Sequence, residues 1–199
     1  RFSSPEDGGT RIVFRYGFAR WRLISKNSQP PRKSIMPTIE VVTRIDAPLS
    51  VCFDLARDID FHVRSLEHTG ERAVDGVTSG LIGLGESVTW QAKHGGVTQR
   101  LTSKITAFEP PRYFQDTMTR GAFKQFRHDH FFQPHPDDAA ITVMRDVIEF
   151  RSPWGPLGWL VDRWWMASYL NRLIAERGAA IRDEAQRLAG DEPALTSDS

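Results

Sequence analysis

Alternating apolar and polar residues fill the middle of this chain, and a long amphipathic segment follows them. From Gly155 onward, in GPLGWLVDRWWMASYLNRLIAERGAAIRDEAQ, apolar residues recur at spacings of three and four, which predicts one long helix. A curved antiparallel sheet wrapped around that helix is the simplest architecture that buries the apolar surfaces of both. The predicted fold class is therefore α+β. The runs that predict the strands are TIEVVTRI, ESVTWQAKH, VTQRLTSKITAFE, YFQDTMT, FKQFRHDHFFQ and ITVMRDVIEF.

Two short helices are predicted after the first strand. In DAPLSVCFDLARD, either Asp46 or Ser50 is expected to cap a helix that carries Val51 and Leu55 inward, and residues 59–65 predict a second one. The chain's single cysteine, Cys52, falls within this apolar pattern. It is expected to be a small core residue rather than a reactive thiol.

The turn signals predict a meander with short loops. Gly95-Gly96 indicates a hairpin, Pro110-Pro111 ends the longest strand, and turns are expected at Arg120-Gly121 and at HPDDAA. The segment GLIGLG lacks the lysine and the spacing of a nucleotide-binding loop, and it leads into a strand rather than a helix. Nucleotide binding is therefore not expected.

Period-two alternation assigns side chains to one face of each later strand, and each face mixes large apolar groups with a few polar ones. Such a mixture is typical of an apolar cavity with selective polar contacts. The three faces carry Phe114, Asp116 and Met118; Phe126, His128, His130 and Phe132; and Thr142, Met144, Asp146, Ile148 and Phe150. The candidate residues for the cavity lining are Trp90, Phe114, Asp116, Met118, Phe126, His128, His130, Met144, Asp146 and, from the helix, Trp164.

The helix pattern separates an inward stripe from an outward one. The inward stripe comprises Leu157, Leu160, Val161, Trp164, Ser168, Asn171, Ile174, Gly178 and Ile181, and the outward side comprises Asp162, Arg163, Arg172, Glu176 and Arg177. The tryptophans at 154, 159, 164 and 165 crowd the first turns. They are expected to pack in the core, with the entrance of a ligand site as the alternative.

His128 and His130 are the sharpest chemical candidates, because residues two apart on a strand share a face. They could ligate a metal if Asp116 or Asp146 supplied a third ligand, but cross-strand register cannot be read from sequence, so no metal or cofactor is assigned. They could also act with these carboxylates in acid–base chemistry. The simpler expectation is that the carboxylates pair with Arg127, Arg145 or Arg120. His62 is expected to be a partly exposed helix residue, with a place at the mouth of the cavity as the alternative.

Composition narrows the classes of partner. Residues 1–35 carry eight Lys or Arg against two Asp or Glu, whereas the whole chain has a formal charge of +1, so the remainder is acidic. An acidic body argues against broad nucleic-acid binding. The most apolar window, residues 157–174, contains charged residues and does not predict a membrane span. We expect a cytoplasmic protein in which residues 1–35 form a disordered or non-native extension, residues 36–188 one domain, and residues 189–199 a disordered tail.

Several phrases resemble a known family. DAPLSVCFDLARDIDFH, GLIGLGESVTW, LTSKITAFEPPRYFQD, GAFKQFRHDHFF and RSPWGPLGWLVDR resemble the ligand-binding members of the SRPBCC superfamily, the START-like or polyketide cyclase/dehydrase-like proteins. The resemblance spans residues 36–186. It implies the helix-grip fold, a sheet wrapped around a C-terminal helix with a deep apolar pocket between them. Members of this branch are often labelled cell division inhibitors.

Three functions follow as expectations, because fold alone does not decide function. The first is noncatalytic binding of a small hydrophobic ligand, such as a lipid, polyketide, isoprenoid or aromatic metabolite, without a cofactor. The second is a cyclase or dehydratase that uses the His and Asp residues. The third is a regulatory protein that docks an unidentified protein partner through the aromatic start of the helix.

Overall fold

The computed structural model describes residues 11–14, 38–94, 97–151 and 166–191, and within them one antiparallel sheet holds all the named strands. Eight strands run in the spatial order β1-β2-β8-β7-β6-β5-β4-β3. The strands are β1 (Arg11–Phe14), β2 (Thr38–Ile45), β3 (Arg72–Gly76), β4 (Ser87–His94), β5 (Val97–Glu109), β6 (Tyr113–Arg120), β7 (Gln125–His135) and β8 (Asp138–Arg151). The helices are α1 (Leu49–Ala56), α2 (Ile59–Ser65), the short 3-10 helix η1 (Glu67–Thr69) and α4 (Ala167–Asp191).

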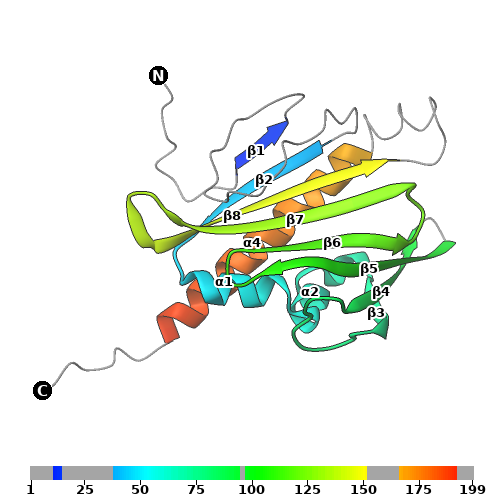
Figure 1. Ribbon diagram of the computed structural model, residues 1–199, viewed down its shortest axis with the longest axis horizontal. Coiled ribbons are helices and arrows are strands. Elements are labelled where there is room, and N and C mark those ends of the chain that lie inside the picture. Colours follow the sequence, from blue (N-terminus) through cyan, green and yellow to red (C-terminus); the bar gives the residue numbers. More distant parts are fainter. Residues whose placement is uncertain (1–10, 15–37, 95–96, 152–165, 192–199) are drawn as a thin grey trace, which may run out of the picture.

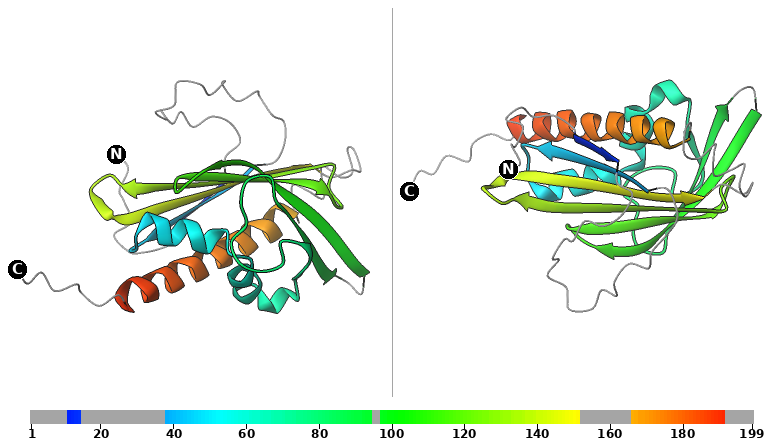
Figure 2. Two further views of the ribbon diagram at one scale, coloured as in Figure 1. Left: turned by 60° about the horizontal axis from the view of Figure 1, so that its bottom comes forward. Right: turned by 90° about the horizontal axis from the view of Figure 1, so that it is seen from above.

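The helices cover one face of the sheet. Figures 1 and 2 show α4 running across that face, with α1 and α2 on the same side. Register shifts interrupt the pairing of β5 with β6 between Thr102 and Ser103 and between Ile105 and Ala107. Such bulges bend a strand and increase its twist. They contribute to the curvature that leaves space between the sheet and the helices.

The alternation read from the sequence gives the correct faces. Phe132, Met144, Ile148 and Phe150 are all buried, and so is Phe114. The pairing of β6, β7 and β8 then decides which of the polar residues on these faces are neighbours. Asp116 lies opposite His128 and Phe114 lies opposite His130 across β6 and β7, while His130 lies opposite Asp146 across β7 and β8.

The described part of the long helix buries Asn171, Ile174 and Ile181 as the periodicity predicts, but two assignments are wrong. Ser168 is exposed and Arg177 is buried. The helical spacing explains why Arg177 is buried, because this position lies three residues after Ile174 and four before Ile181, in the middle of the inward face of α4. Its charge led to the opposite assignment. The predicted helix start, residues 155–165, lies outside the described residues.

Gly178 sets how closely α4 approaches the sheet. A Cβ atom at this position would lie 2.6 Å from Oγ1 of Thr43 on β2, whose side chain is fully buried. Real Cβ atoms do not approach another heavy atom that closely, so a larger residue requires a local shift. Glycine here therefore permits the close packing of helix and strand.

The two short helices form as predicted, although the cap of the first is different. The residue before α1 is Pro48, and no side chain caps the helix, so neither Asp46 nor Ser50 has the expected role. The α2 helix spans the predicted residues 59–65, and its first turn is capped by Asp58, whose carboxylate accepts a hydrogen bond from the backbone N–H of Phe61 at 2.9 Å.

The core has two parts along α4. The larger joins α1, α2 and the inner faces of β4–β8, and Phe53 is its centre, because its ring contacts those of Phe108, Phe114 and Phe132 at 5.4–5.6 Å between centroids. The smaller lies near the start of α4 and contains Ile39, Val41, Ile148, Phe150, Ala167, Leu170 and Ile174. Cys52 is fully buried as expected, and burial raises the pKa of its thiol to about 11.

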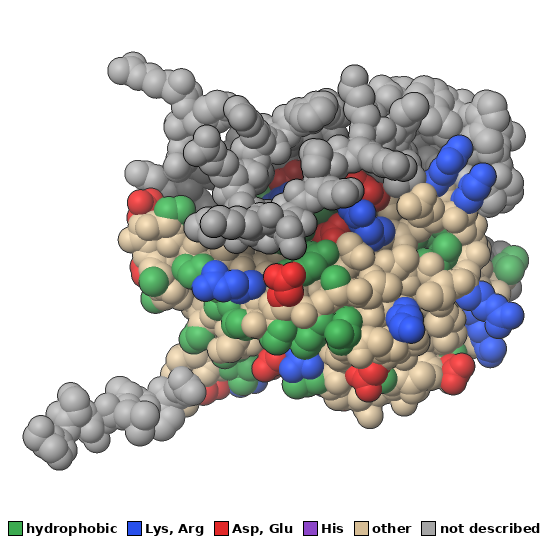
Figure 3. All heavy atoms as spheres, in the orientation of Figure 1, with side chains coloured by type: hydrophobic (Ala, Val, Ile, Leu, Met, Phe, Trp, Pro, Cys, Tyr) green, Lys and Arg blue, Asp and Glu red, His purple; other side chains and the backbone are tan. Residues whose placement is uncertain are grey.

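The first and last of the described elements are β1 and α4. The β1 strand lies within the segment expected to be an extension, and it pairs with β2 in antiparallel register, with Arg11 opposite Val42. The α4 helix continues to Asp191, beyond the expected boundary at residue 188. On the face shown in Figure 3, acidic and basic side chains are interspersed. No helix in the described ranges is long and apolar enough to cross a membrane.

Candidate functional site

A cavity of about 690 Å³ lies between the curved sheet, the short helices and α4. Its lining is largely apolar and is contributed by α1, α2, β4–β8 and α4. The apolar lining residues include Ile59, Leu66, Ile82, Val88, Trp90, Leu101, Ile105, Phe114, Phe123, Phe126, Ile148, Leu170 and Ile174. This volume falls within the range of about 300 to 1,000 Å³ typical of small-molecule sites.

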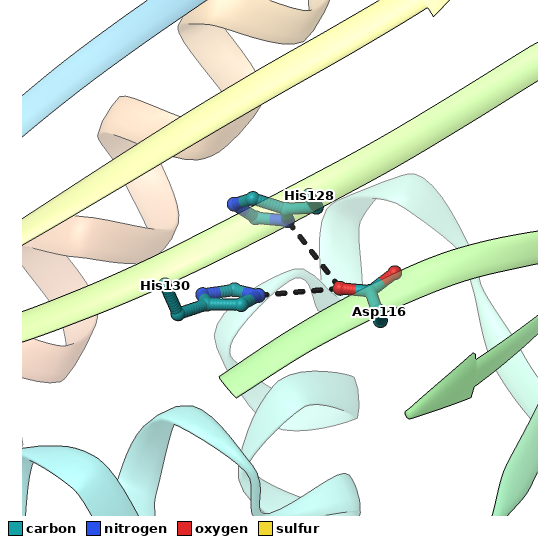
Figure 4. Close-up of side chains that lie close together, drawn as sticks. All are labelled: Asp116, His128 and His130. Carbon is teal, nitrogen blue, oxygen red and sulfur yellow. Dashed lines mark hydrogen bonds and ion pairs between the residues drawn. The ribbon is translucent and has the colours of Figure 1, made fainter. Parts of the chain in front are cut away.

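A cluster of two histidines and two carboxylates forms the polar part of one wall. Asp116, His128 and His130 line the cavity, and Asp146 lies behind them on β8. Asp146 Oδ1 lies 3.0 Å from Nε2 of His128 and 2.8 Å from Nδ1 of His130. Asp116 Oδ2 lies 3.2 Å from Nε2 of His130 and 3.7 Å from Nδ1 of His128. Dashed lines in Figure 4 mark these two contacts. We call these four residues the His–Asp cluster.

Packing fixes the orientation of the imidazoles in the His–Asp cluster. The ring of Phe114 stacks on that of His130 with centroids 4.1 Å apart and an interplanar angle of 17°. The rings of His128 and His130 lie 3.7 Å apart between centroids. Because both histidines are buried, these contacts leave their rings little rotational freedom.

The two imidazoles have opposite pKa shifts. Burial lowers the pKa of His128, and the neighbouring charge of His130 lowers it further. Burial also acts to lower the pKa of His130, but the adjacent carboxylates of Asp116 and Asp146 outweigh it, so the net pKa of His130 is raised. The two shifts favour a cationic His130 beside a neutral His128.

Both carboxylates remain ionised despite burial. Burial acts to raise the pKa of Asp116 and that of Asp146, but the hydrogen bonds and charges of the two histidines outweigh it and hold both values below the ordinary range. Ser103 also contributes a hydrogen bond that lowers the pKa of Asp116. The negative charges of the cluster are thus held by adjacent donors, which is the condition for burying charge at tolerable cost.

Arg177 brings a second positive charge to the cavity wall from α4. Burial lowers the pKa of its guanidinium, while the charges of Asp146 and Asp116 act in the opposite direction. Its Nη2 donates a hydrogen bond to the backbone carbonyl of Ala56 at the end of α1. A protonated Arg177 together with a protonated His130 balances the two carboxylates, so the wall is polar yet close to neutral.

His62 is a partly exposed residue of α2, as expected, and it also lines the cavity. Its side chain is 16% exposed, and its ring stacks on that of Trp90 with centroids 4.1 Å apart. Its Nε2 lies 2.9 Å from Oε2 of Glu71. The pKa of His62 is lowered, mainly by burial and to a smaller extent by the positive charge of Arg177.

The structure brings together most of the candidate lining residues from the sequence. Those that line the cavity are Trp90, Phe114, Asp116, Phe126, His128 and His130. Asp146 belongs to the His–Asp cluster behind this lining, and Met144 is packed in the core. Met118 lies on β6 at partial exposure and, among the described residues, is not part of the lining. Trp164 lies outside the described residues, as do the other tryptophans of the predicted helix start.

The expected pairing of Asp116 and Asp146 with arginines is wrong. Arg127 instead contacts Asp129 at 3.0 Å and Glu149 at 3.3 Å, and Arg145 contacts Glu40 at 3.0 Å. The reason is alternation, since Arg127 and Arg145 have odd numbers on β7 and β8 and therefore face away from the His–Asp cluster.

No family model and no curated protein sequence matches this chain, whereas several solved structures have a similar fold. The fold is similar to that of the Zhui aromatase/cyclase from a Streptomyces species, with a TM-score of 0.61 and 16% identity over 76% of this chain and 94% of that one. It is similar to a START superfamily protein from Mycobacterium smegmatis, with a TM-score of 0.56 and 9% identity over 76% of this chain and 98% of that one.

A third similar structure is the major latex-like protein 151 of Panax ginseng, with a TM-score of 0.53 and 14% identity over 76% of this chain and 99% of that one. These similarities confirm the START/Bet v 1-like helix-grip fold that the resemblance to the SRPBCC superfamily implies. Since all three identities are low, they establish the fold rather than a ligand or a reaction.

Proposed function

Starting from a START/Bet v 1-like helix-grip fold, we propose that this protein binds a small, mostly apolar molecule in the cavity and holds the molecule's polar group against the His–Asp cluster. The observation that carries the proposal is the combination of an apolar cavity of about 690 Å³ with a compact polar cluster on one wall. Lipids, polyketides, isoprenoids and aromatic metabolites with a hydroxyl or carbonyl group have this chemistry.

The two kinds of surface have different roles in this proposal. Burial of ligand carbon supplies affinity, on the order of 25 cal/mol per Å² of apolar surface removed from water. The His–Asp cluster selects orientation, because Asp116 lines the cavity and can accept a hydrogen bond from a ligand hydroxyl. Since the cluster is already ordered by Phe114 and Asp146, binding requires little rearrangement of these groups.

The test adds bulk to the cavity wall and leaves the residues of the His–Asp cluster unchanged. Ala92 on β4 lines the cavity, whereas Ala140 on β8 is exposed and lies outside its described lining, so Ala92→Trp and Ala140→Trp are matched substitutions. A titration with the fluorescent apolar probe anilinonaphthalene sulfonate should show one binding site in the wild type and in Ala140→Trp. Binding should be at least about tenfold weaker in Ala92→Trp, because bulk added to a packed site displaces the ligand. Equal binding by both variants would contradict the proposal.

A cyclase or dehydratase is the second candidate, and one observation favours it. A neutral His128 beside a cationic His130 provides a base and an acid on one cavity wall, and opposite pKa shifts in neighbouring groups are typical of such pairs. With polyketide-like substrates, His128→Gln should then abolish turnover while binding persists. A carrier would show altered affinity in this variant and would have no turnover in the wild type.

A further inference from the structure

The three cavity-facing members of the His–Asp cluster converge on one another as metal ligands do. The donor atoms of Asp116, His128 and His130 all lie within 4.8 Å of one another. In a tetrahedral zinc site with bonds of about 2.0 to 2.1 Å, neighbouring donor atoms are about 3.3 Å apart. Asp116 Oδ2 lies 3.2 Å from His130 Nε2 and 3.7 Å from His128 Nδ1, so only small side-chain movements would admit an ion.

The fourth member, Asp146, supplies an independent indication. Metal-bound histidines usually donate their other ring N–H to a carboxylate, which fixes the tautomer and turns the remaining lone pair to the metal. Asp146 Oδ1 forms a hydrogen bond with His128 Nε2 at 3.0 Å, and it lies 2.8 Å from His130 Nδ1 in an ion contact without hydrogen-bond geometry. His128 Nδ1 and His130 Nε2 are the ring nitrogens that face Asp116, and binding of an ion releases the proton that a cationic His130 carries on Nε2.

We propose that His128 Nδ1, His130 Nε2 and a carboxylate oxygen of Asp116 bind one divalent first-row transition metal ion, with Asp146 orienting both imidazoles. Two imidazoles and one carboxylate suit ions such as Zn²⁺ and Fe²⁺. Three protein ligands leave a coordination position open toward the cavity, where a water molecule or the polar group of a bound molecule completes the shell.

The charged groups around this site affect its affinity for a metal ion. Asp116 and Asp146 attract a dication, whereas Arg177 on the facing helix repels it and keeps the affinity below that of a site with carboxylates alone. The proposal does not depend on the binding of an apolar molecule, because it stands on the donor atoms of the cluster. Its test therefore uses the metal alone.

The first experiment titrates the metal-free protein with Zn²⁺ by calorimetry and with Co²⁺ by visible absorption. The wild type should bind one equivalent, and Asp116→Asn should weaken binding by at least about 100-fold through loss of a charged ligand. Asp146→Asn should weaken it by about 10- to 100-fold, as expected for a residue that orients the ligands. Asp129→Asn is the matched control, since Asp129 lies between the two histidines on β7 but contacts Arg127 and Tyr113. It should bind like the wild type.

A second measurement needs no substitution and so does not depend on whether a variant folds. In ¹⁵N spectra of the wild-type histidines, Zn²⁺ should shift His128 Nδ1 and His130 Nε2, while His128 Nε2 and His130 Nδ1 stay protonated. The absence of stoichiometric binding, or Zn²⁺-induced shifts confined to other histidines such as the exposed His68, would overturn the proposal.

Discussion

Replacing Asp146 by Asn should strongly destabilise the protein, because the same carboxylate oxygen contacts two buried imidazoles. The distances are 3.0 Å to His128 and 2.8 Å to His130, and all three side chains are at most 6% exposed. Removal of one partner from a buried ionic group costs about 3 to 5 kcal/mol, since Asp116 alone then has to balance the charges of His130 and Arg177. We therefore expect the free energy of unfolding to fall by roughly 3 kcal/mol or more at pH 5.5.

The choice of pH follows from the sign of each shift. The lowered pKa of Asp146 stabilises the folded state above the ordinary carboxyl value of about 4, and this contribution is lost as the pH falls below it. The raised pKa of His130 contributes stability that is complete below the ordinary histidine value of about 6.5, and it is lost as the pH rises through the folded-state value. Both contributions are present together between these limits.

The assay is urea unfolding followed by circular dichroism from pH 3 to 9, with Asp75→Asn as the control at an exposed carboxylate. The difference between Asp146→Asn and the wild type should be largest between about pH 4 and 6.5 and should shrink on either side. The control should stay within about 0.5 kcal/mol of the wild type at every pH. A difference below about 1 kcal/mol at pH 5.5 would refute the account of a buried ionic cluster.

Three further predictions concern other parts of the cavity wall and core. Gly178→Ala should lower the free energy of unfolding by about 1 kcal/mol, since the clash with Thr43 Oγ1 costs more than the gain in helix propensity. Adding Thr43→Ala should restore most of the lost free energy, and a double-mutant cycle measured by urea unfolding checks this. The Cys52 thiol should react with a disulfide reagent only when the protein unfolds, because it is buried and its pKa is raised to about 11; rapid reaction in the native state would contradict this. Because the pKa of His62 is lowered, the free energy of unfolding should decrease as the pH falls below about 6.5. His62→Gln should reduce the dependence of this free energy on pH by up to about 1.4 kcal/mol per pH unit. An unchanged pH dependence would exclude a buried neutral imidazole.

The strands could be predicted from the sequence because their side-chain pattern reports burial directly. Alternation along FRHDHFF placed His128 and His130 on the inner face and Asp129 on the outer one, and the structure agrees. The limits of the second short helix were correct because Asp58 and the apolar spacing of Ile59 and Phe61 mark its first turn.

The His–Asp cluster could not be assembled from the sequence, because it depends on register between strands. Pairing partners are decided by loop lengths and bulges, and a slip of one residue would have turned Asp116 away from His128. Arg177 was assigned to the wrong face because its charge was given more weight than its position in the helix. The spacing from Ile174 to Ile181 carried the correct signal.

The most direct test of the central claim is native mass spectrometry of protein purified without detergent, followed by denaturing extraction of any small molecule it carries. The account predicts a stoichiometric apolar molecule with one polar group in the wild type and its loss from Ala92→Trp, in which an added indole ring occupies part of the cavity. Wild-type protein that carries nothing, and whose melting temperature is unchanged by a panel of lipids, polyketides and aromatic metabolites, would contradict it.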